Sequence, residues 1–264
     1  MSATEFIKSV TLHTGSYHSS SLGREQRYAY LIPEGANQSG SAALPLLVLL
    51  HGRQCSYLDW TDKTRIARYA ASHRMIIAFP DGGNGWYTDS FKGEMAGQRE
   101  SDIITDFLPH LQRTLPLVEP GAGWGIGGFS MGGYGAVKLA LKHPKLFSLA
   151  FSHSGALDVT QISEARSIFG DREQNAAFRR SESVYWLAEQ ALCRFPSERP
   201  RLLIDCGVDD ESIDASRNFH QHLTFVGYQH RYSEMPGHHT WPYWDRAVRT
   251  ILPDVAGMLG EGVR

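Results

Sequence analysis

The chain has 264 residues, of which 42% are hydrophobic and 20% are charged, and its formal net charge is −2. A chain of this length buries a large core within one domain, and its composition does not call for a second. Acidic and basic residues are interspersed, so we expect neither a nucleic-acid partner nor a membrane partner. Three cysteines without a C-x-x-C pair argue against a disulfide framework and against a thiolate zinc site.

The N-terminal sequence and the hydropathy pattern predict a cytoplasmic protein. Residues 1–5 carry no basic patch followed by an apolar run, which is the mark of a secretory signal peptide. No stretch approaches the roughly 18 consecutive apolar residues of a membrane span. An odd number of cysteines also suits a reducing compartment.

Strand-like and helix-like segments alternate along the chain, which predicts an α/β architecture. Residues 6–13 and 27–32 alternate polar and apolar side chains, as half-exposed antiparallel edge strands do. Continuous apolar runs at 44–50 and 75–79 predict strands that are covered on both faces. Further strands are expected at 124–128, 146–151, 202–205 and 230–233.

Apolar residues with helical spacing predict helices at 58–73, 103–115, 132–143 and 243 to about 259. The helix that ends at 143 is followed by Pro144, a normal helix stop. The segment 157–191 fits the alternation poorly, because a polar, arginine-rich run precedes an amphipathic piece near Tyr185. We expect this segment to be an insertion above the strand ends, forming a small cap on a single domain that spans 1–264.

Gly128-Phe129-Ser130-Met131-Gly132 matches G-x-S-x-G, the nucleophile elbow of α/β-hydrolases. In such a turn the serine has a strained backbone, and the residues two before and two after it come so close that only glycine fits. The match by itself arises often by chance, but here it lies between an expected strand and an expected helix. We therefore predict Ser130 as nucleophile in an α/β-hydrolase fold, with a mostly parallel central sheet and helices on both faces.

The catalytic base of this fold is a histidine in a loop after the last strand. His238 and His239 both lie there, between the expected strand at 230–233 and the final helix, and spacing does not separate them. His51, His143 and His153 come too early in the chain, so a structural role suits them better.

The acid of this fold lies in the loop after the preceding strand. Three adjacent carboxylates, Asp209, Asp210 and Glu211, follow the strand expected at 202–205. Each of them could instead cap the segment that follows. The acid has to orient the imidazole from a partly buried position, a criterion that selects the loop but not the residue.

Four motifs, taken together, resemble the esterase D family, and most nearly its tributyrin esterases, which hydrolyse short-chain acyl esters. The motifs are Leu50-His51-Gly52, Asn84-Gly85-Trp86-Tyr87-Thr88-Asp89, Ser130-Met131-Gly132-Gly133-Tyr134-Gly135 and His239-Thr240-Trp241-Pro242-Tyr243-Trp244. The same family holds S-formylglutathione hydrolases, feruloyl esterases and mycolyltransferases. The resemblance runs in matching order from about residue 24 to residue 244.

The resemblance implies roles for individual residues. The family nucleophile falls on Ser130. The family histidine stands two residues before one tryptophan and five before another, which matches His239 rather than His238. The family acid stands in a Cys-Gly-x-x-Asp context, which matches Asp210, with Asp209 as the second choice.

The resemblance also implies an oxyanion hole formed by the backbone N–H groups of Arg53 and Met131. Two departures from the family pattern concern the surroundings of this site. The residues after His-Gly are usually small, whereas this chain has Arg53-Gln54-Cys55. In the loop before the acid, Val208-Asp209 replaces the Gly-Glu-type sequence of the family. The bulkier residues beside the oxyanion turn bear on the range of substrates.

The implied activity is that of a serine carboxylesterase that hydrolyses short-chain acyl esters through an acyl-enzyme, without a cofactor. Trp86, Tyr87 and Trp241 are candidates for the wall of the acyl pocket, although buried aromatic residues also serve core packing. The expected partner is a small-molecule ester, and the resemblance makes a homo-oligomer an expectation too.

Four other functions compete with this interpretation. An S-formylglutathione hydrolase-type thioesterase would use the same site, but the chain lacks a His-Ser context after the last strand. An acyltransferase would usually be secreted, and no leader is visible. A non-catalytic binding module would not need serine, acid and histidine candidates in the right order. A metal-dependent hydrolase would need ligands such as H-E-x-x-H, which the sequence lacks.

Overall fold

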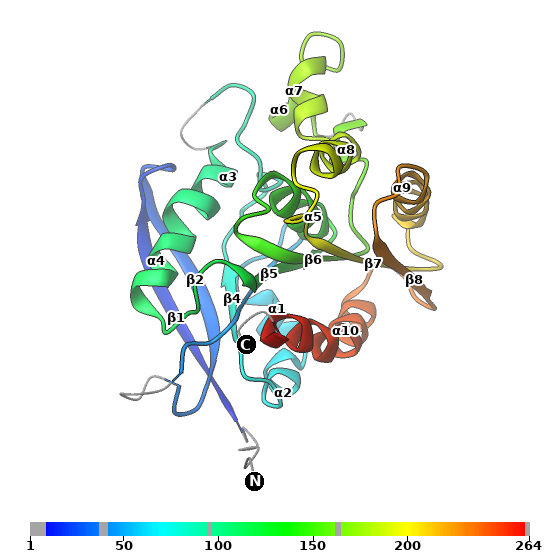
Figure 1. The fold of residues 1–264 in the computed structure, drawn as a ribbon. Helices are drawn as coiled ribbons and strands as arrows, with labels where there is room; N and C mark the ends of the chain where they lie inside the picture. The colour runs from blue at the N-terminus through cyan, green and yellow to red at the C-terminus, as the bar shows by residue number, and fades with distance from the viewer. Residues whose placement is uncertain (1–8, 37–41, 94–96, 162–164, 262–264) are drawn as a thin grey trace.

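The computed structural model describes residues 9–36, 42–93, 97–161 and 165–261. Within these ranges, eight strands form one sheet in the order β1-β2-β4-β3-β5-β6-β7-β8 (Figure 1). The strands are β1 (Val10–Ser19), β2 (Arg24–Pro33), β3 (Leu46–Leu50), β4 (Ile76–Pro80), β5 (Gly121–Phe129), β6 (Phe147–His153), β7 (Arg201–Gly207) and β8 (His230–Met235). β2 pairs antiparallel with both β1 and β4, and all other neighbours are parallel.

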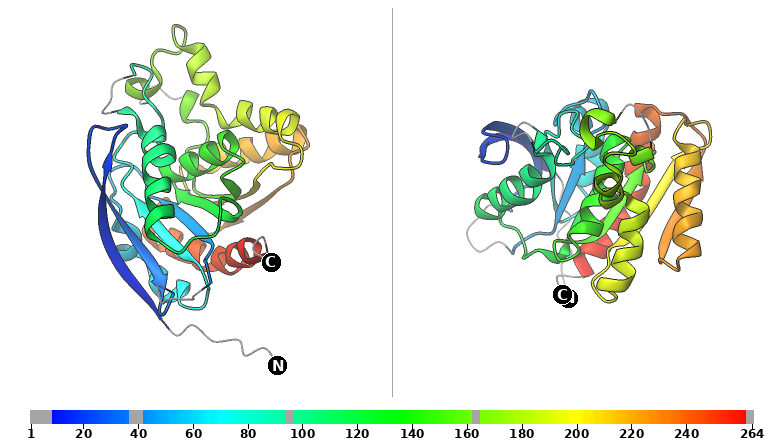
Figure 2. Two further views of the ribbon diagram at one scale, coloured as in Figure 1. Left: turned by 60° about the vertical axis from the view of Figure 1, so that its left-hand side comes forward. Right: turned by 90° about the horizontal axis from the view of Figure 1, so that it is seen from above.

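Helices cover both faces of the sheet, as the sequence predicted (Figures 1 and 2). One face carries α4 (Leu108–Thr114), α5 (Met131–Lys142), α8 (Val184–Arg194) and α9 (Ile213–Phe225), and the other carries α1 (Asp59–Lys63), α2 (Ile66–Ala70) and α10 (Trp241–Glu261). A short helix α3 (Arg99–Ser101) and a π-helical turn, Asp102–Phe107, lead into α4. No helix within the described ranges is long and apolar enough to cross a bilayer.

The apolar run of β3 shows why this strand lies at the centre. Successive side chains of a strand point to opposite faces, so Leu46, Val48 and Leu50 pack under α4 and α5 while Leu47 and Leu49 pack against α1, α2 and α10. All five are fully buried. Complete burial of such a side chain contributes about 1.5–3 kcal/mol. A strand with apolar residues at every position is therefore stable only where both faces are covered.

The helix predicted at 58–73 is wrong as a single element, because it is broken into α1 and α2. The break lies at Thr64, whose backbone is extended (φ −132°, ψ 172°). The Thr64 hydroxyl accepts a hydrogen bond from the N–H of Ile66, and the Asp245 carboxylate accepts one from the N–H of Arg65. Side-chain acceptors thus replace the helical carbonyls at this point.

The strand predicted at 6–13 also differs from the structure. β1 begins at Val10 and continues to Ser19, where it pairs residue by residue with β2. Residues 6–8 lie outside the described residues. The other predicted strands agree with the observed ones to within a few residues at each end.

The segment 157–191 contains a 3₁₀ turn (Val159–Gln161), α6 (Arg166–Phe169), α7 (Ala176–Ser181) and most of α8. In Figure 1, α6 and α7 project beyond the body of the molecule. The buried Arg179 guanidinium ties this part together by donating hydrogen bonds to the carbonyl oxygens of Thr160 and Gly170. In contrast, α8 contributes Leu187 and Ala188 to the core beside α5.

Candidate active site

Ser130 occupies the sharp turn between β5 and α5. Its backbone has φ 53° and ψ −120°, and its N–H donates to the carbonyl oxygen of His153 at 3.0 Å. A Cβ atom added at Gly132 would lie 2.5 Å from the carbonyl oxygen of Leu50, and one at Gly128 would lie 2.5 Å from the carbonyl carbon of Gly132. Both glycines are therefore required by the close approach of three backbone segments.

Ser130, His239 and Asp210 form one chain of hydrogen bonds. His239 Nε2 is 3.0 Å from Ser130 Oγ, and His239 Nδ1 is 2.9 Å and 3.1 Å from the two carboxylate oxygens of Asp210. Because the Asp210 carboxylate can only accept, Nδ1 carries the imidazole proton and Nε2 is free to accept the serine proton. The arrangement is that of a nucleophile, a base and an orienting acid.

The Asp210 side chain is held as a carboxylate. It is buried and accepts a hydrogen bond from the N–H of Ser212 at 2.8 Å in addition to the bond with His239. Burial alone would raise the pKa of Asp210, but the hydrogen bonds from His239 and Ser212 lower it below the ordinary value. The imidazole therefore faces a negative charge at neutral pH.

The remaining candidates for base and acid do not reach Ser130. His238 is exposed, and its Nδ1 lies 3.1 Å from the carbonyl oxygen of Asp209. Asp209 and Glu211 are also exposed. Among the alternatives that the sequence left open, His239 is the histidine that contacts Ser130, and Asp210 is the carboxylate that contacts His239.

The three earlier histidines make contacts of their own, His51 and His153 in the interior and His143 at a partly buried position. His143 Nε2 is 2.9 Å from a Glu100 oxygen, and His153 Nδ1 is 2.6 Å from an Asp205 oxygen. His51 Nε2 accepts the N–H of Gly82 at 2.9 Å. These contacts agree with the structural roles expected for them.

The turn after β3 lies beside the start of α5. β3 and β5 are parallel neighbours with Leu50 opposite Gly128, so the residues that follow each strand are adjacent. Met131 is the first residue of α5, and its N–H is one of the amides that a helix leaves unpaired. The N–H of Arg53 has no acceptor within the described ranges. The N–H groups of Arg53 and Met131 thus lie at adjacent strand ends.

Asn84 supports this turn, a contact that sequence reasoning missed. Its side-chain oxygen accepts the N–H of Gln54 at 2.7 Å, and Gln54 has a positive φ of 61°. A non-glycine residue in this conformation needs support from its surroundings. Asn84 stands at the start of the Asn-Gly-Trp-Tyr motif, so the motif itself was the available signal.

The three aromatic candidates for the acyl pocket differ in accessibility. Tyr87 is 0% exposed, and its hydroxyl donates to the carbonyl oxygen of His51 at 3.0 Å, a position that favours a structural role. Trp86 is 8% exposed and contacts the ring edge of Tyr134. Trp241 is partly buried. The two tryptophans therefore keep surface that a ligand could contact.

A buried ionic cluster adjoins the loop that carries Trp86, and sequence reasoning missed it. The ammonium group of Lys138 is 0% exposed. Four acceptors lie within hydrogen-bonding distance of its three N–H groups: Tyr87 O (2.6 Å), Thr88 Oγ1 (2.9 Å), Glu100 Oε2 (2.7 Å) and Glu182 Oε2 (3.0 Å). Lys142 contacts the same two glutamates. The cluster connects the helix after Ser130 with three other segments.

No group of three or more histidine, cysteine, aspartate or glutamate side chains in the described residues is arranged to hold a metal ion.

The parallel sheet, the strained serine turn and the Ser130–His239–Asp210 chain define a serine hydrolase of the α/β-hydrolase fold. The family described as Putative esterase matches residues 19–255, and the chain belongs to this family. Both the predicted fold and the predicted family are confirmed.

Relatives of known name fit this assignment. The chain is 28% identical to an acetyl esterase of Caldicellulosiruptor saccharolyticus, over 79% of this chain and 82% of the relative. It is 25% identical to an S-formylglutathione hydrolase of Paracoccus denitrificans, over 75% of each chain. The fold is similar to that of FphF, a fluorophosphonate-binding serine hydrolase of Staphylococcus aureus, with a TM-score of 0.82 and 22% identity over 94% of this chain and 99% of the other. The enzyme class is therefore that of a carboxylic ester hydrolase.

Proposed function

We propose that this chain is a serine carboxylesterase that hydrolyses short-chain acyl esters, with Ser130, His239 and Asp210 as its catalytic triad. The 3.0 Å contact between His239 Nε2 and Ser130 Oγ carries this proposal, because it joins a nucleophile to a base that a carboxylate already orients. The similarity to an acetyl esterase supports a short acyl group.

In the first step His239 Nε2 takes the hydroxyl proton as Ser130 Oγ attacks the ester carbonyl carbon. The negative charge that forms on the carbonyl oxygen is stabilised by the N–H groups of Met131 and Arg53. Removal of one such donor typically costs roughly 10²–10³-fold in rate. His239 then returns the proton to the leaving alkoxide, and an acyl-enzyme remains on Ser130.

In the second step a water molecule replaces the alcohol. His239 takes a proton from this water as its oxygen attacks the acyl carbon, and the same two N–H groups stabilise the second oxyanion. Collapse of the intermediate returns the proton to Ser130 Oγ and releases the carboxylic acid. The Asp210 carboxylate stabilises the imidazolium in both steps.

The variant Ser130→Ala tests the proposal directly. We expect it to lose hydrolysis of p-nitrophenyl acetate and labelling by a fluorophosphonate probe, with unchanged thermal unfolding. The matched control is Ser233→Ala, since Ser233 is an exposed serine on β8. Hydrolysis by Ser130→Ala at the wild-type rate would exclude Ser130 as nucleophile.

A thioesterase acting on S-formylglutathione is the second candidate. The similarity to the Paracoccus S-formylglutathione hydrolase favours it, and the same serine chemistry would cleave a thioester. The ratio of kcat/KM for S-formylglutathione to that for p-nitrophenyl acetate separates the two functions. A ratio far above one would assign the thioester as substrate, and a ratio far below one supports the carboxylesterase.

Two further features belong to this proposal. The protein works in the cytoplasm, which its three free cysteines support, since thiols stay reduced there. The segment 157–191 acts as a cap on a single domain, supported by the contact of Phe169 with Tyr134 in α5. Deletion of α6 and α7 with a short linker should change the acyl-length preference of the enzyme and leave its fold intact.

A further inference from the structure

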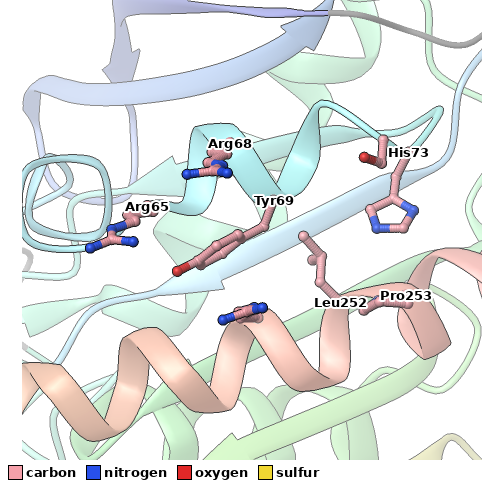
Figure 3. A pocket seen from close by; sticks show the side chains of 8 residues that line it. Arg65, Arg68, Tyr69, His73, Leu252 and Pro253 are labelled. Carbon is pink, nitrogen blue, oxygen red and sulfur yellow. The ribbon is translucent and has the colours of Figure 1, made fainter.

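A cavity of about 440 Å³ lies between α2 and α10 (Figure 3), and its lining includes none of the residues of the proposed reaction. His73, one of its lining residues, lies just before β4 begins. The cavity therefore opens near the amino ends of the parallel strands. Ser130 follows the carboxyl end of β5, at the opposite edge of the sheet.

Three guanidinium groups line this cavity. Arg65 and Arg68 come from the region of α2, and Arg249 comes from α10. In the part of the chain that the structure describes, none of the three guanidinium groups has a hydrogen-bonded or ion-paired partner. Elsewhere on the surface, Arg217 is paired with Glu234. Three unpaired cations around one concave site attract an anion.

Asp245 lies beside this cavity but does not pair with the arginine side chains in the described residues. One oxygen of Asp245 accepts the backbone N–H of Arg65 at 2.7 Å, and the other accepts the Tyr69 hydroxyl at 2.9 Å. Both hydrogen bonds come from neutral donors. The carboxylate joins α2 to α10, and the three guanidinium groups are unpaired in the described residues.

The remaining lining is mixed: Ser72 and His73 are polar, whereas Tyr69, Leu252 and Pro253 give the cavity an apolar side. Figure 3 shows the Tyr69 side chain extending from α2 above α10, with Leu252 and Pro253 on the α10 side. A volume of about 440 Å³ lies within the range of small-molecule sites. A ligand that fits this lining carries a compact anionic group and an apolar part.

We propose that this cavity binds a small organic phosphate. A guanidinium group presents paired N–H donors that match two phosphate oxygens, and three such groups line this one cavity. The apolar part of the ligand then packs against Tyr69 and Leu252. This site is separate from the esterase site and does not rest on the proposed function.

The test is calorimetric titration of the full chain with phenyl phosphate. Phenol and sodium chloride at matched ionic strength serve as ligand controls. We expect saturable binding to the wild type, weakened about tenfold or more in Arg68→Gln and in Arg249→Gln, because each substitution removes a charge-assisted hydrogen-bond donor. Arg113→Gln, at an exposed position of α4, is the matched charge control and should bind like the wild type.

Binding should persist after Ser130 has been labelled with a fluorophosphonate, and hydrolysis of p-nitrophenyl acetate should be unchanged in the arginine variants. Absence of saturable binding would overturn the proposal, and so would an equal loss of affinity in Arg113→Gln. Retention on phosphatidic acid vesicles that Arg68→Gln abolishes, without binding of phenyl phosphate, would identify a lipid phosphate and overturn the assignment to a small molecule.

Discussion

The ammonium group of Lys138 lies 2.6 Å from the backbone carbonyl oxygen of Tyr87. Lys138 belongs to the helix that begins directly after Ser130, and Tyr87 belongs to the loop after β4. Trp86 and Tyr87 both have positive φ, 56° and 51°, a conformation that non-glycine residues rarely adopt. The buried amine therefore holds a strained segment against the nucleophile helix.

Lys138→Met should destabilise the protein by about 3 kcal/mol. The substitution leaves Glu100 and Glu182 buried with fewer cationic partners, and breaking a buried ion pair on one side is costly. Urea unfolding followed by fluorescence measures the change. Lys145→Met, at an exposed position, is the matched control. A loss in the free energy of unfolding no larger than that of Lys145→Met would show that water stabilises the two glutamates in place of the lysine.

The same cluster makes the free energy of unfolding depend on acid pH. Burial alone would raise the pKa of Glu100, but Lys138, His143 and Lys142 lower it well below its ordinary value of 4.5. A carboxyl with a lowered pKa in the folded state stabilises the protein fully above its unfolded pKa. This contribution is lost as the pH falls through the lower, folded-state pKa.

We therefore expect the stability of the wild type to fall as the pH drops below roughly 5. Glu100→Gln should reduce this dependence of the free energy of unfolding on acid pH, since the amide does not titrate. Denaturant unfolding at a series of pH values measures the slope, and Glu198→Gln, at an exposed position, should leave it unchanged. An identical slope in Glu100→Gln and wild type would contradict the assignment.

Asp210→Asn should lower kcat for p-nitrophenyl acetate by roughly 10⁴-fold while KM changes little. The amide no longer provides the negative charge that orients His239 and stabilises its imidazolium. Steady-state kinetics measure the effect. Asp209→Asn is a matched control, because Asp209 is exposed, and it should keep near wild-type kcat. A large loss of kcat in Asp209→Asn and a near wild-type kcat in Asp210→Asn would identify Asp209 as the acid.

Gly132→Ala should abolish activity and reduce the yield of folded protein. The added Cβ would lie 2.5 Å from Leu50 O and 2.7 Å from His51 O, and backbone atoms do not move aside cheaply. Gly257→Ala in α10 is the control, because a Cβ there meets nothing within 4 Å. That variant should be as stable as the wild type or up to about 1 kcal/mol more stable.

Asn84→Ala should lower kcat about tenfold with little change in KM, because the turn that presents the Arg53 N–H loses its side-chain acceptor. Gln54→Gly in the Asn84→Ala background should restore part of the activity, since glycine adopts a positive φ without strain. Kinetics on p-nitrophenyl acetate decide the matter. An unchanged kcat in Asn84→Ala would mean that the turn keeps its shape unaided.

Much of the fold could be predicted from the sequence because a strand buried on both faces is a continuous run of apolar residues. The run at 44–50 needs cover on both faces, and it became the central strand β3. The nucleophile turn was likewise predictable, since close approach requires glycine at 128 and 132. The helix break at Thr64 was not, because it depends on Asp245, which is 180 residues from Arg65 in sequence.

The site was only partly predictable for a related reason. Spacing placed two histidines and three carboxylates in the correct loops but did not say which of them turns inward. Hydrogen bonding to Ser130 and Ser212 makes that distinction, and it exists only in three dimensions. The Lys138 cluster was missed entirely, because Glu100 and Glu182 lie 38 and 44 residues away from the lysine.

The contact between Ser130 and His239 joins residues that are 109 positions apart. His239 follows β8 in the sequence, so the contact requires the loop after β8 to reach the turn at the end of β5. A nascent chain still lacking β8 would therefore emerge from the ribosome without a base beside its serine. The onset of ester cleavage by a nascent chain would therefore indicate when β8 and the loop after it have docked.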